Sequence, residues 1–421
     1  MTRPHEVVER TLAAAAHLVG CAVIVRETSQ AVLRWANSTM TTNGHSTAGS
    51  VTVVALVGVH GGTAAGVAAS SVAITAPEQL TDLVQAAEAA ARGAGPAQDA
   101  MPLPEPTDTD PDWADPAGVT SIAVFSELVD GLAEVLAGPQ RQYGYAAHSV
   151  VTTWLGTSAG VRRRWVQPSG YVELNAKTPD LAGSAWVGVS TADFRDVDVV
   201  ELAAGAARRL AWGARRVELP AGRHETLLPP SAVADLMLYL AWSMDGRPAQ
   251  EGRSALAGPD GPRTGERLSA LPLTLTCDPT APGLEYPPFL STSWSGDGLS
   301  VFDNGAPNRR VDWVREGVVH ELGYSRAEAA EFGTAFTPPG ENLLLTGLTR
   351  DGVYLVEGGE VVAEVAHNFR FNYSPLDVLR RTTEVGATER TLPREMDGFT
   401  RAAMPPMRVP EFNMSSVSLG R

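Results

Sequence analysis

One strongly apolar stretch in the second half of the chain constrains the fold more than any other. Residues 223–247 read RHETLLPPSAVADLMLYLAWSMDGR, and the run Ala232–Trp242 predicts a helix. Ser231, after Pro229-Pro230, is a suitable N-cap because its side-chain oxygen can accept a hydrogen bond from a free helix N–H. Asp245-Gly246 supplies a stop. Because the helix is apolar on most sides, we expect it to be buried.

The side chains of this helix show whether it could carry the ligands of a zinc peptidase. In a zinc peptidase, a buried helix presents two His and a Glu, one turn apart and facing one cavity. The corresponding residues 238–243 read LYLAWS, and none of these side chains ligates zinc well or accepts a proton from water. His-Glu pairs begin at residues 5, 224 and 320, but none has a second His one turn later. We therefore expect no catalytic residue, no cofactor site and no metal ligand in this chain.

Length, charge and composition narrow the class of protein. The 421 residues are enough for two or three domains with apolar cores. A net charge of -15 argues against a nucleic-acid partner, because phosphate binding needs a basic surface. No apolar run reaches about 18 residues and no signal pattern opens the chain, so we expect a cytoplasmic protein with no membrane contact. Cys21 and Cys277 are too few for a zinc cluster, and Cys21 is expected to be buried.

The first half of the chain predicts an N-terminal α+β domain, residues 1–215, with an internal duplication. A helix, four strands and a helix occur twice, and Arg34-Trp35 in the first copy matches Arg164-Trp165 in the second. The alternative is that any α+β chain shows loosely similar strings. Residues 94–117, dense in Pro and Asp, predict a solvated linker or long surface loop. The expected helices are 5–19, 77–92, 119–136 and 197–214, and the expected strands are 21–26, 31–41, 51–59, 66–74, 148–155, 161–167, 171–175 and 185–190.

The second half, residues 216–421, predicts a mostly β domain built around the one buried helix. Gly358-Gly359 is a candidate tight turn between two strands, and Pro375 can open a short helix ending near Arg381. The expected strands are 273–276, 299–302, 311–314, 317–322, 343–346, 352–357 and 360–367.

Several of these segments resemble the TldD/PmbA family. They are NSTMTTNGHS (37–46), LLPPSAVADLM (227–237), FDNGAPNRR (302–310) and GLTRDGVYLVEGGEVVAEVAHNFRFNYSPLDVL (347–379). The family pairs two homologous subunits, of which TldD carries a HExxxH zinc helix and TldE (PmbA) lacks it. This chain resembles TldE.

The resemblance implies a non-catalytic subunit of a heterodimeric zinc peptidase or amidase. A TldD-like partner would then supply the zinc and the catalytic Glu. The substrate would be a peptide, a small amide or a peptide-like intermediate of natural-product biosynthesis, such as an antibiotic. Two other classes remain open: a stand-alone binding or regulatory homodimer without peptidase activity, and an independent hydrolase that uses His320 and Asp303.

Candidate contact residues fall into three groups, each with a structural alternative. The resemblance places residues 37–46 beside the substrate groove and the subunit contact, whereas the residues alone also fit an Asx-rich turn. Arg beside amides and aromatics suits carboxylate recognition, or else a structural or interface role. Aromatic residues at the zinc positions either fill the vacated space or face the partner. The candidates are Asn37, Thr42, Asn43, Asn308, Arg309, Arg310, Asn368, Arg370, Asn372, Tyr239 and Trp242.

Overall fold

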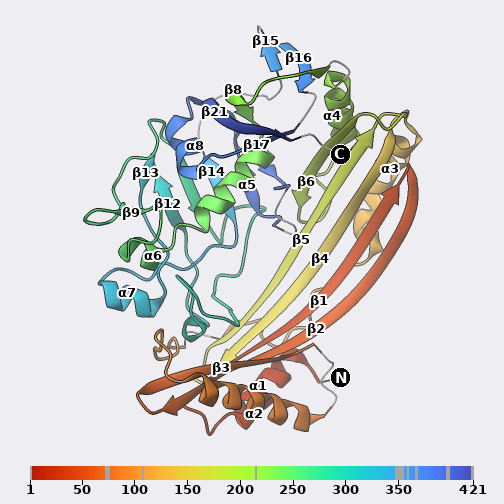
Figure 1. Ribbon diagram of the computed structural model, residues 1–421. Helices are drawn as coiled ribbons and strands as arrows, with labels where there is room; N and C mark the ends of the chain where they lie inside the picture. The colour runs from red at the N-terminus through yellow and green to blue at the C-terminus, as the bar shows by residue number, and fades with distance from the viewer. Residues whose placement is uncertain are drawn as a thin grey trace.

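The computed structural model describes residues 2–71, 76–106, 109–213, 216–346, 355–357, 360–365, 368–394 and 399–418. It confirms an α+β fold, with a long curved antiparallel sheet on one side and a second group of shorter sheets and helices on the other (Figure 1). No described helix is long and apolar enough to span a membrane.

The long sheet contains the first six strands in the order β3-β2-β1-β4-β5-β6. Its chain order is helix, three strands and helix, followed by the same series again. The elements are α1 (Pro4–Ala14), β1 (Gly20–Ala36), β2 (Thr39–Val59), β3 (Gly62–Ser70), α2 (Pro77–Ala94), the 3-10 turn η1 (Ile122–Phe125), α3 (Ser126–Ala137), β4 (Arg141–Thr157), β5 (Arg162–Lys177), β6 (Ser184–Thr191) and α4 (Val199–Trp212).

The strand order is symmetrical about the centre of the sheet, with three strands from each series on either side. The first strands of the two units, β1 and β4, pair antiparallel at the centre from Ala22↔Thr157 to Trp35↔Gly144, and each unit runs outward from there. Each unit has three strands where the sequence predicted four. The predicted match of two Arg-Trp pairs is wrong, because Trp35 lies on the first strand of its unit and Trp165 on the second strand of the other.

The predicted strands were too short because polar residues do not interrupt this sheet. Segment 27–30, expected as a break, continues the ladder inside β1 and pairs with both β2 and β4. Likewise, 168–170 remain paired within β5. A ladder of backbone hydrogen bonds tolerates polar side chains wherever one face of the sheet is partly open.

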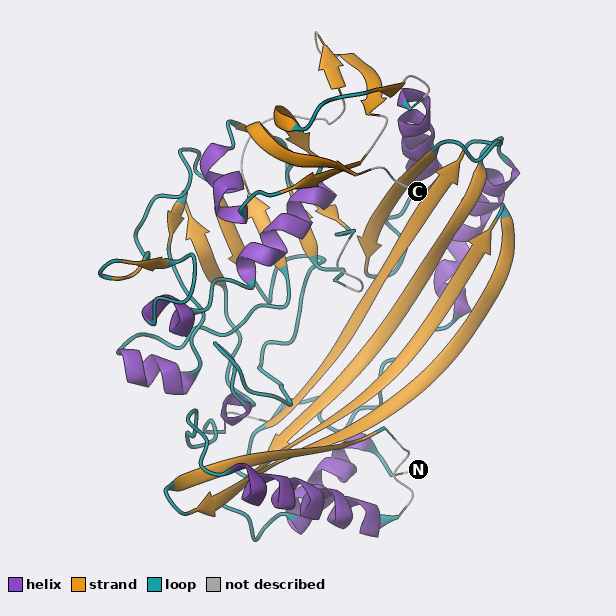
Figure 2. Ribbon diagram, in the orientation of Figure 1, coloured by secondary structure: helices purple, strands orange, loops and turns teal. Residues whose placement is uncertain are grey.

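Successive side chains along each strand point to opposite faces of the long sheet. Odd-numbered residues of β1 lie under helices at both ends of the sheet, Val23 with α1 and α2, and Trp35 with α3 and α4. Even-numbered residues face the second half of the chain: Ile24 packs against Phe289 and Phe302. At the other end of the same face, Arg34 is exposed. Figure 2 shows the second half of the chain on this concave side of the sheet.

The connector between the two units was predicted as a solvated linker or a long surface loop. Its described residues after α2 form no helix or strand and none is buried, as in a long surface loop, and several of them pack against the sheet. Met101 and Leu103 contact the apolar cluster around Ile24, and Trp113 contacts the cluster around Val23. Asp110 pairs with Arg163 (2.9 Å). The Pro- and Asp-rich composition here reflects an extended strap held by specific contacts.

The second half forms a sheet of order β13-β12-β11-β14-β20-β19, and a further sheet in which β21 pairs with β8, β17 and β18. Predicted strands 299–302 and 317–322 are wrong: the first is largely a 3-10 turn, and the second keeps only two strand residues. The predicted turn at 358–359 lies outside the described residues. The elements are β7 (Arg216–Val217), β8 (Gly222–Leu228), α5 (Pro230–Ala241), α6 (Gly246–Gln250), β9 (Ala257–Gly258), β10 (Gly261–Pro262), β11 (Thr274–Cys277), η2 (Val301–Asp303), β12 (Val311–Arg315), β13 (Val318–Val319), α7 (Arg326–Phe332), β14 (Leu343–Thr346), β15 (Leu355–Glu357), β16 (Glu360–Val365), β17 (Asn368–Phe371), α8 (Pro375–Arg381), β18 (Glu384–Val385), β19 (Glu389–Thr391), β20 (Ala402–Met404) and β21 (Met407–Ser418).

Close packing of α2 on β3 gives a direct test of the first unit. A Cβ added at Gly66 on β3 would collide with the backbone of Ala87 and Ala91, whereas one added at Gly93 on α2 would meet nothing within 4 Å. We expect Gly66→Ala to lower the free energy of unfolding by about 1–3 kcal/mol or more. Gly93→Ala is expected to raise it by about 0.5–1 kcal/mol, because Ala favours helix. Urea unfolding of both variants measures the difference, and a Gly66→Ala variant as stable as Gly93→Ala would contradict the packing.

Candidate functional site

The predicted apolar helix is α5, and its start differs from expectation by two residues. Pro229 is the N-cap and Pro230 occupies the first helical position, where its missing N–H is not needed. Ser231 therefore lies inside the first turn and is not the cap. At the other end, the Ser243 hydroxyl donates to the Leu240 carbonyl (2.7 Å) and closes the last turn.

One side of α5 is the centre of the largest core of the molecule. Val233, Ala234, Met237 and Leu238 are buried, with exposed fractions of 2% or less, against strands of the second half of the chain. Leu238, the first residue of the segment where a zinc helix would carry its ligands, is thus enclosed by apolar side chains. Residues 238–243 do not fit a zinc ion.

The aromatic pair on the opposite side of α5 faces outward. Tyr239 is 48% exposed and Trp242 59% exposed, and their rings meet edge to face with centroids 5.6 Å apart. The interpretation that these rings fill a vacated space is therefore wrong. A partner-facing role for Tyr239 and Trp242 stays a prediction.

A cavity of about 550 Å³ runs along this exposed side, and we call it the α5 cleft. Its far wall is a group of aromatic rings on β17, β21 and the segment between β17 and α8: Tyr373 stacks on Phe412 at 4.7 Å, and Phe371 lies 5.5 Å from Phe412. The lining is mainly apolar, and consists of Leu228, Ala232, Asp235, Leu236, Tyr239, Leu240, Ser243, Ala255, Phe371, Tyr373, Ser374, Pro375, Leu376, Phe412 and Met414.

Few polar groups interrupt the α5 cleft. The Tyr373 hydroxyl is buried, no described residue hydrogen-bonds to it, and burial raises its pKa. A buried hydroxyl without a partner is energetically costly. Chemically, the cleft suits an apolar side chain accompanied by a hydrogen-bonding group.

Arg394 is one link between the α5 cleft and the long sheet. Asp235, which lines the cleft, accepts a hydrogen bond from the backbone N–H of Arg394 (3.3 Å). The guanidinium of Arg394 lies over the ring of Trp186 on β6, with its carbon 5.7 Å from the ring centroid. Consistent with this link, β19 contacts β6, and residues 229–231 share a cavity with α4.

Comparison with known proteins agrees with this architecture. Residues 221–350 match the family model described as the PmbA/TldA metallopeptidase C-terminal domain. The fold matches the crystal structure of TldE from Thermococcus kodakarensis, with a TM-score of 0.75, 15% identity, and coverage of 97% of this chain and 99% of that one. Residues 221–350 of this chain thus belong to the TldD/PmbA family.

Two further solved structures of similar fold are each described as a modulator of DNA gyrase. The Thermotoga maritima protein has a TM-score of 0.73 at 16% identity and covers 97% of this chain and 99% of its own. The Bacteroides thetaiotaomicron protein has a TM-score of 0.73 at 12% identity and covers 97% and 98%. No curated protein matches in sequence. At these identities, the likeness shows the TldD/PmbA fold and not a shared activity.

The Asn- and Thr-rich candidates lie away from α5. Asn37 and Ser38 have positive φ angles of 50° and 57° and form the tight turn between β1 and β2. This is the turn that the alternative interpretation expected. Thr42 and Asn43 are exposed on β2, and three strands separate β2 from β6, the strand that contacts β19.

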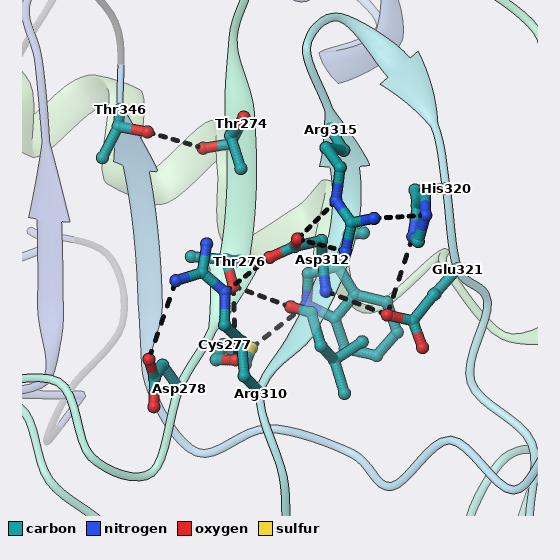
Figure 3. A network of polar contacts seen from close by, with 12 residues as sticks. Thr274, Thr276, Cys277, Asp278, Arg310, Asp312, Arg315, His320, Glu321 and Thr346 are labelled. Atoms are coloured by element: carbon teal, nitrogen blue, oxygen red, sulfur yellow. Dashed lines mark hydrogen bonds and ion pairs between the residues drawn. The ribbon is translucent and has the colours of Figure 1, made fainter.

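The candidates at residues 308–310 have structural partners, and Figure 3 shows those of Arg310. Asn308 is buried and donates to the Pro287 carbonyl (2.9 Å). Arg309 pairs with Glu321 (2.7 Å), and Arg310 pairs with Asp312 (2.9 Å). These contacts support the structural alternative over carboxylate capture.

Of the candidates on and just after β17, the side chains of two are described. Arg370 and Asn372 are exposed, and the backbone N–H of Asn372 donates to the Asn413 carbonyl (3.3 Å). The side chain of Asn368 lies outside the described residues. Phe371, between Arg370 and Asn372, lines the α5 cleft, and sequence reasoning passed over it because an exposed Phe in a strand has no motif.

The proposed hydrolytic pair, His320 and Asp303, takes part in two separate networks. His320 Nε2 accepts from the Arg315 guanidinium (2.8 Å), which occupies the atom that would have to take a proton (Figure 3). Asp303 is buried and paired with Arg326 (2.8 Å). Within the described ranges, no group of three or more His, Cys, Asp or Glu side chains is arranged to hold a metal ion.

Just after α5, the side chain of Asp245 lies near two other acidic side chains, and its pKa is raised. Burial, together with Asp297 and Glu328, raises the pKa of Asp245 from 3.8 to about 7. Native protein then holds a proton that the unfolded chain releases above about pH 4, so this group makes stability fall as pH rises towards 7.

Removing the Asp245 carboxylate tests this assignment. We expect Asp245→Asn to be more stable than the native chain at pH 8, by no more than about 4 kcal/mol, and similar to it at pH 4. Urea unfolding at both pH values measures the change, and exposed Asp260→Asn is the control. An Asp245→Asn variant that is equally destabilised at both pH values would contradict the raised pKa.

Proposed function

We propose that this chain is the non-catalytic, TldE-like subunit of a heterodimeric zinc peptidase or amidase. The observation that carries the proposal is the composition and orientation of α5. Where a zinc helix presents two His and a Glu, this helix has Leu238 in the core and Tyr239 and Trp242 turned to the surface. Membership of residues 221–350 in the TldD/PmbA family and the fold shared with the Thermococcus kodakarensis TldE support it.

In this proposal a TldD-like partner holds the zinc, which activates water and polarises an amide carbonyl. The residues of this chain bind and orient. The α5 cleft takes an apolar side chain of a peptide or peptide-like substrate, and the Phe371 and Phe412 rings of its far wall pack against that side chain. Both contributions position the substrate and leave the chemical step to the partner.

The exposed aromatic pair supports a docking role. Tyr239 and Trp242 are large rings that remain about half exposed on a helix whose other side is fully buried. Aromatic side chains in this setting are common anchors of protein interfaces, because they bury much area with little loss of side-chain entropy. We therefore assign the outward side of α5 to the contact with the TldD-like subunit.

The subunit assignment is tested by co-purification. This chain, tagged and co-expressed with a TldD-like chain from the same genome, should form a 1:1 complex that contains one zinc ion per complex by elemental analysis. The tagged chain purified alone should contain none. Zinc bound by this chain alone, or peptide hydrolysis without the partner, would overturn the proposal. A homodimer that ignores the TldD-like chain would favour the binding or regulatory alternative.

The docking assignment is tested by one substitution with a control. Trp242→Ala should raise the Kd of the complex about 30-fold, or about 2 kcal/mol, as expected for a central aromatic anchor. Val19 is 70% exposed and directly precedes β1, which makes no contact with α5, so Val19→Ala should leave the Kd unchanged. Sedimentation or interferometry measures both values. Equal Kd values for the two variants would place the interface elsewhere.

A further inference from the structure

A second cavity, of about 390 Å³, lies on the concave face of the long sheet. Its floor is a row of three cross-strand neighbours: Arg34 pairs with Tyr145, and Tyr145 pairs with Glu173. We call it the sheet cavity. Its lining is Arg34, Trp35, Ala36, Tyr143, Gly144, Tyr145, Glu173, Asn175, Trp186 and Arg394.

One wall of the sheet cavity is a fixed aromatic ring. Gly188 lies beside Glu173 in the ladder, and a Cβ there would come within 2.7 Å of the Trp186 ring. The missing side chain lets the indole lie close to the sheet, where its Nε1–H donates to Glu173 Oε2 (3.1 Å). Arg394 covers the other side of the ring. The wall is therefore held in place before any ligand arrives.

The charge of this site is opposite to that of the chain. Arg34 and Arg394 are exposed, and no described carboxylate lies within ion-pair distance of either guanidinium. Lys177 lies over the Tyr143 ring at 5.3 Å and adds a third cation. Glu173 is the single acidic residue in the lining, and its Oε2 already accepts from Trp186. A cationic pocket of this kind is distinctive on a chain with a net charge of -15.

From this geometry we propose that the sheet cavity binds a carboxylate attached to an aromatic or apolar group. The guanidinium groups of Arg34 and Arg394 bind the carboxylate, because their planar forks match its two oxygens. The Tyr145 ring stacks against the apolar part of the ligand, and the edge of the Trp186 ring borders it. The cavity recognises this chemistry whether it comes from the C-terminal end of a peptide or from a free aromatic acid.

The peptide source rests on the proposed function, whereas the carboxylate recognition rests only on the residues of the cavity. Arg394 connects the two regions, since its N–H is held by Asp235 of the α5 cleft while its side chain lies on Trp186.

The experiment measures binding to the full-length chain by calorimetry or NMR titration. The probes are acetyl-Ala-Phe with a free carboxylate, the same dipeptide as its C-terminal amide, and phenylacetate. We expect the free acid to bind at least tenfold more tightly than the amide. Tighter binding of the dipeptide than of phenylacetate identifies a peptide end as the ligand, and the reverse order identifies a small aromatic acid.

Substitutions connect this preference to the cavity. Arg34→Gln and Arg394→Gln should each weaken binding of the free acid about tenfold and remove most of the difference between acid and amide. Arg92→Gln, an exposed arginine on α2 at the other end of the sheet, should change neither. Circular dichroism confirms folding of each variant.

Equal affinity for acid and amide, or undiminished binding by both arginine variants, would overturn the proposal. These outcomes are separate from those of the co-purification experiment. The chain can fail to pair with a TldD-like subunit and still bind the acid, or pair with it and show no preference for a carboxylate.

Discussion

The antiparallel pairing of β1 with β4 is the constraint on which the rest of the structure depends. It joins the two series of helix, three strands and helix through fourteen consecutive residue pairs, from Ala22↔Thr157 to Trp35↔Gly144. Side chains alternate along both strands, so one choice of register sends Trp35 under the helices and Arg34 to the concave face. A slip of one residue would exchange the two, burying a guanidinium among apolar side chains at high energetic cost.

Much of this architecture could be predicted from the sequence, because the signals were local. The apolar run 232–242 defined α5, and the helix–strand–helix series indicated the repeated order of elements. Strand lengths were less predictable, since polar segment 27–30 looks like a loop unless the neighbouring strands that pair with it are known. The strap before α3 could be predicted as a surface loop, but its contacts with the sheet could not. Its order comes from contacts such as Asp110 with Arg163, which are distant in sequence.

Some features of the candidate site could also be predicted from the sequence, and others could not. Sequence identified α5 and the absence of ligand-type residues at 238–243, because both are properties of single positions. It could not tell which way Tyr239 and Trp242 point, since a helix that is apolar on nearly every side gives no clear periodicity. Nor could it find the sheet cavity. Arg34, Glu173 and Arg394 have no common motif, and only strand pairing and the path of the chain beside β6 bring them together.

Arg394 contacts both the α5 cleft and the wall of the sheet cavity, which bears on how the chain would respond to a partner. Asp235 is fixed on α5, whose opposite side is rigid core, and it holds the backbone of Arg394. Trp186 donates a hydrogen bond to Glu173 on the sheet, and the guanidinium of Arg394 lies over the Trp186 ring. Any subunit that presses on the outward side of α5 near Tyr239 therefore also bears on the wall of the sheet cavity. Arg394 is not the whole of this link, because β19 contacts both α5 and β6.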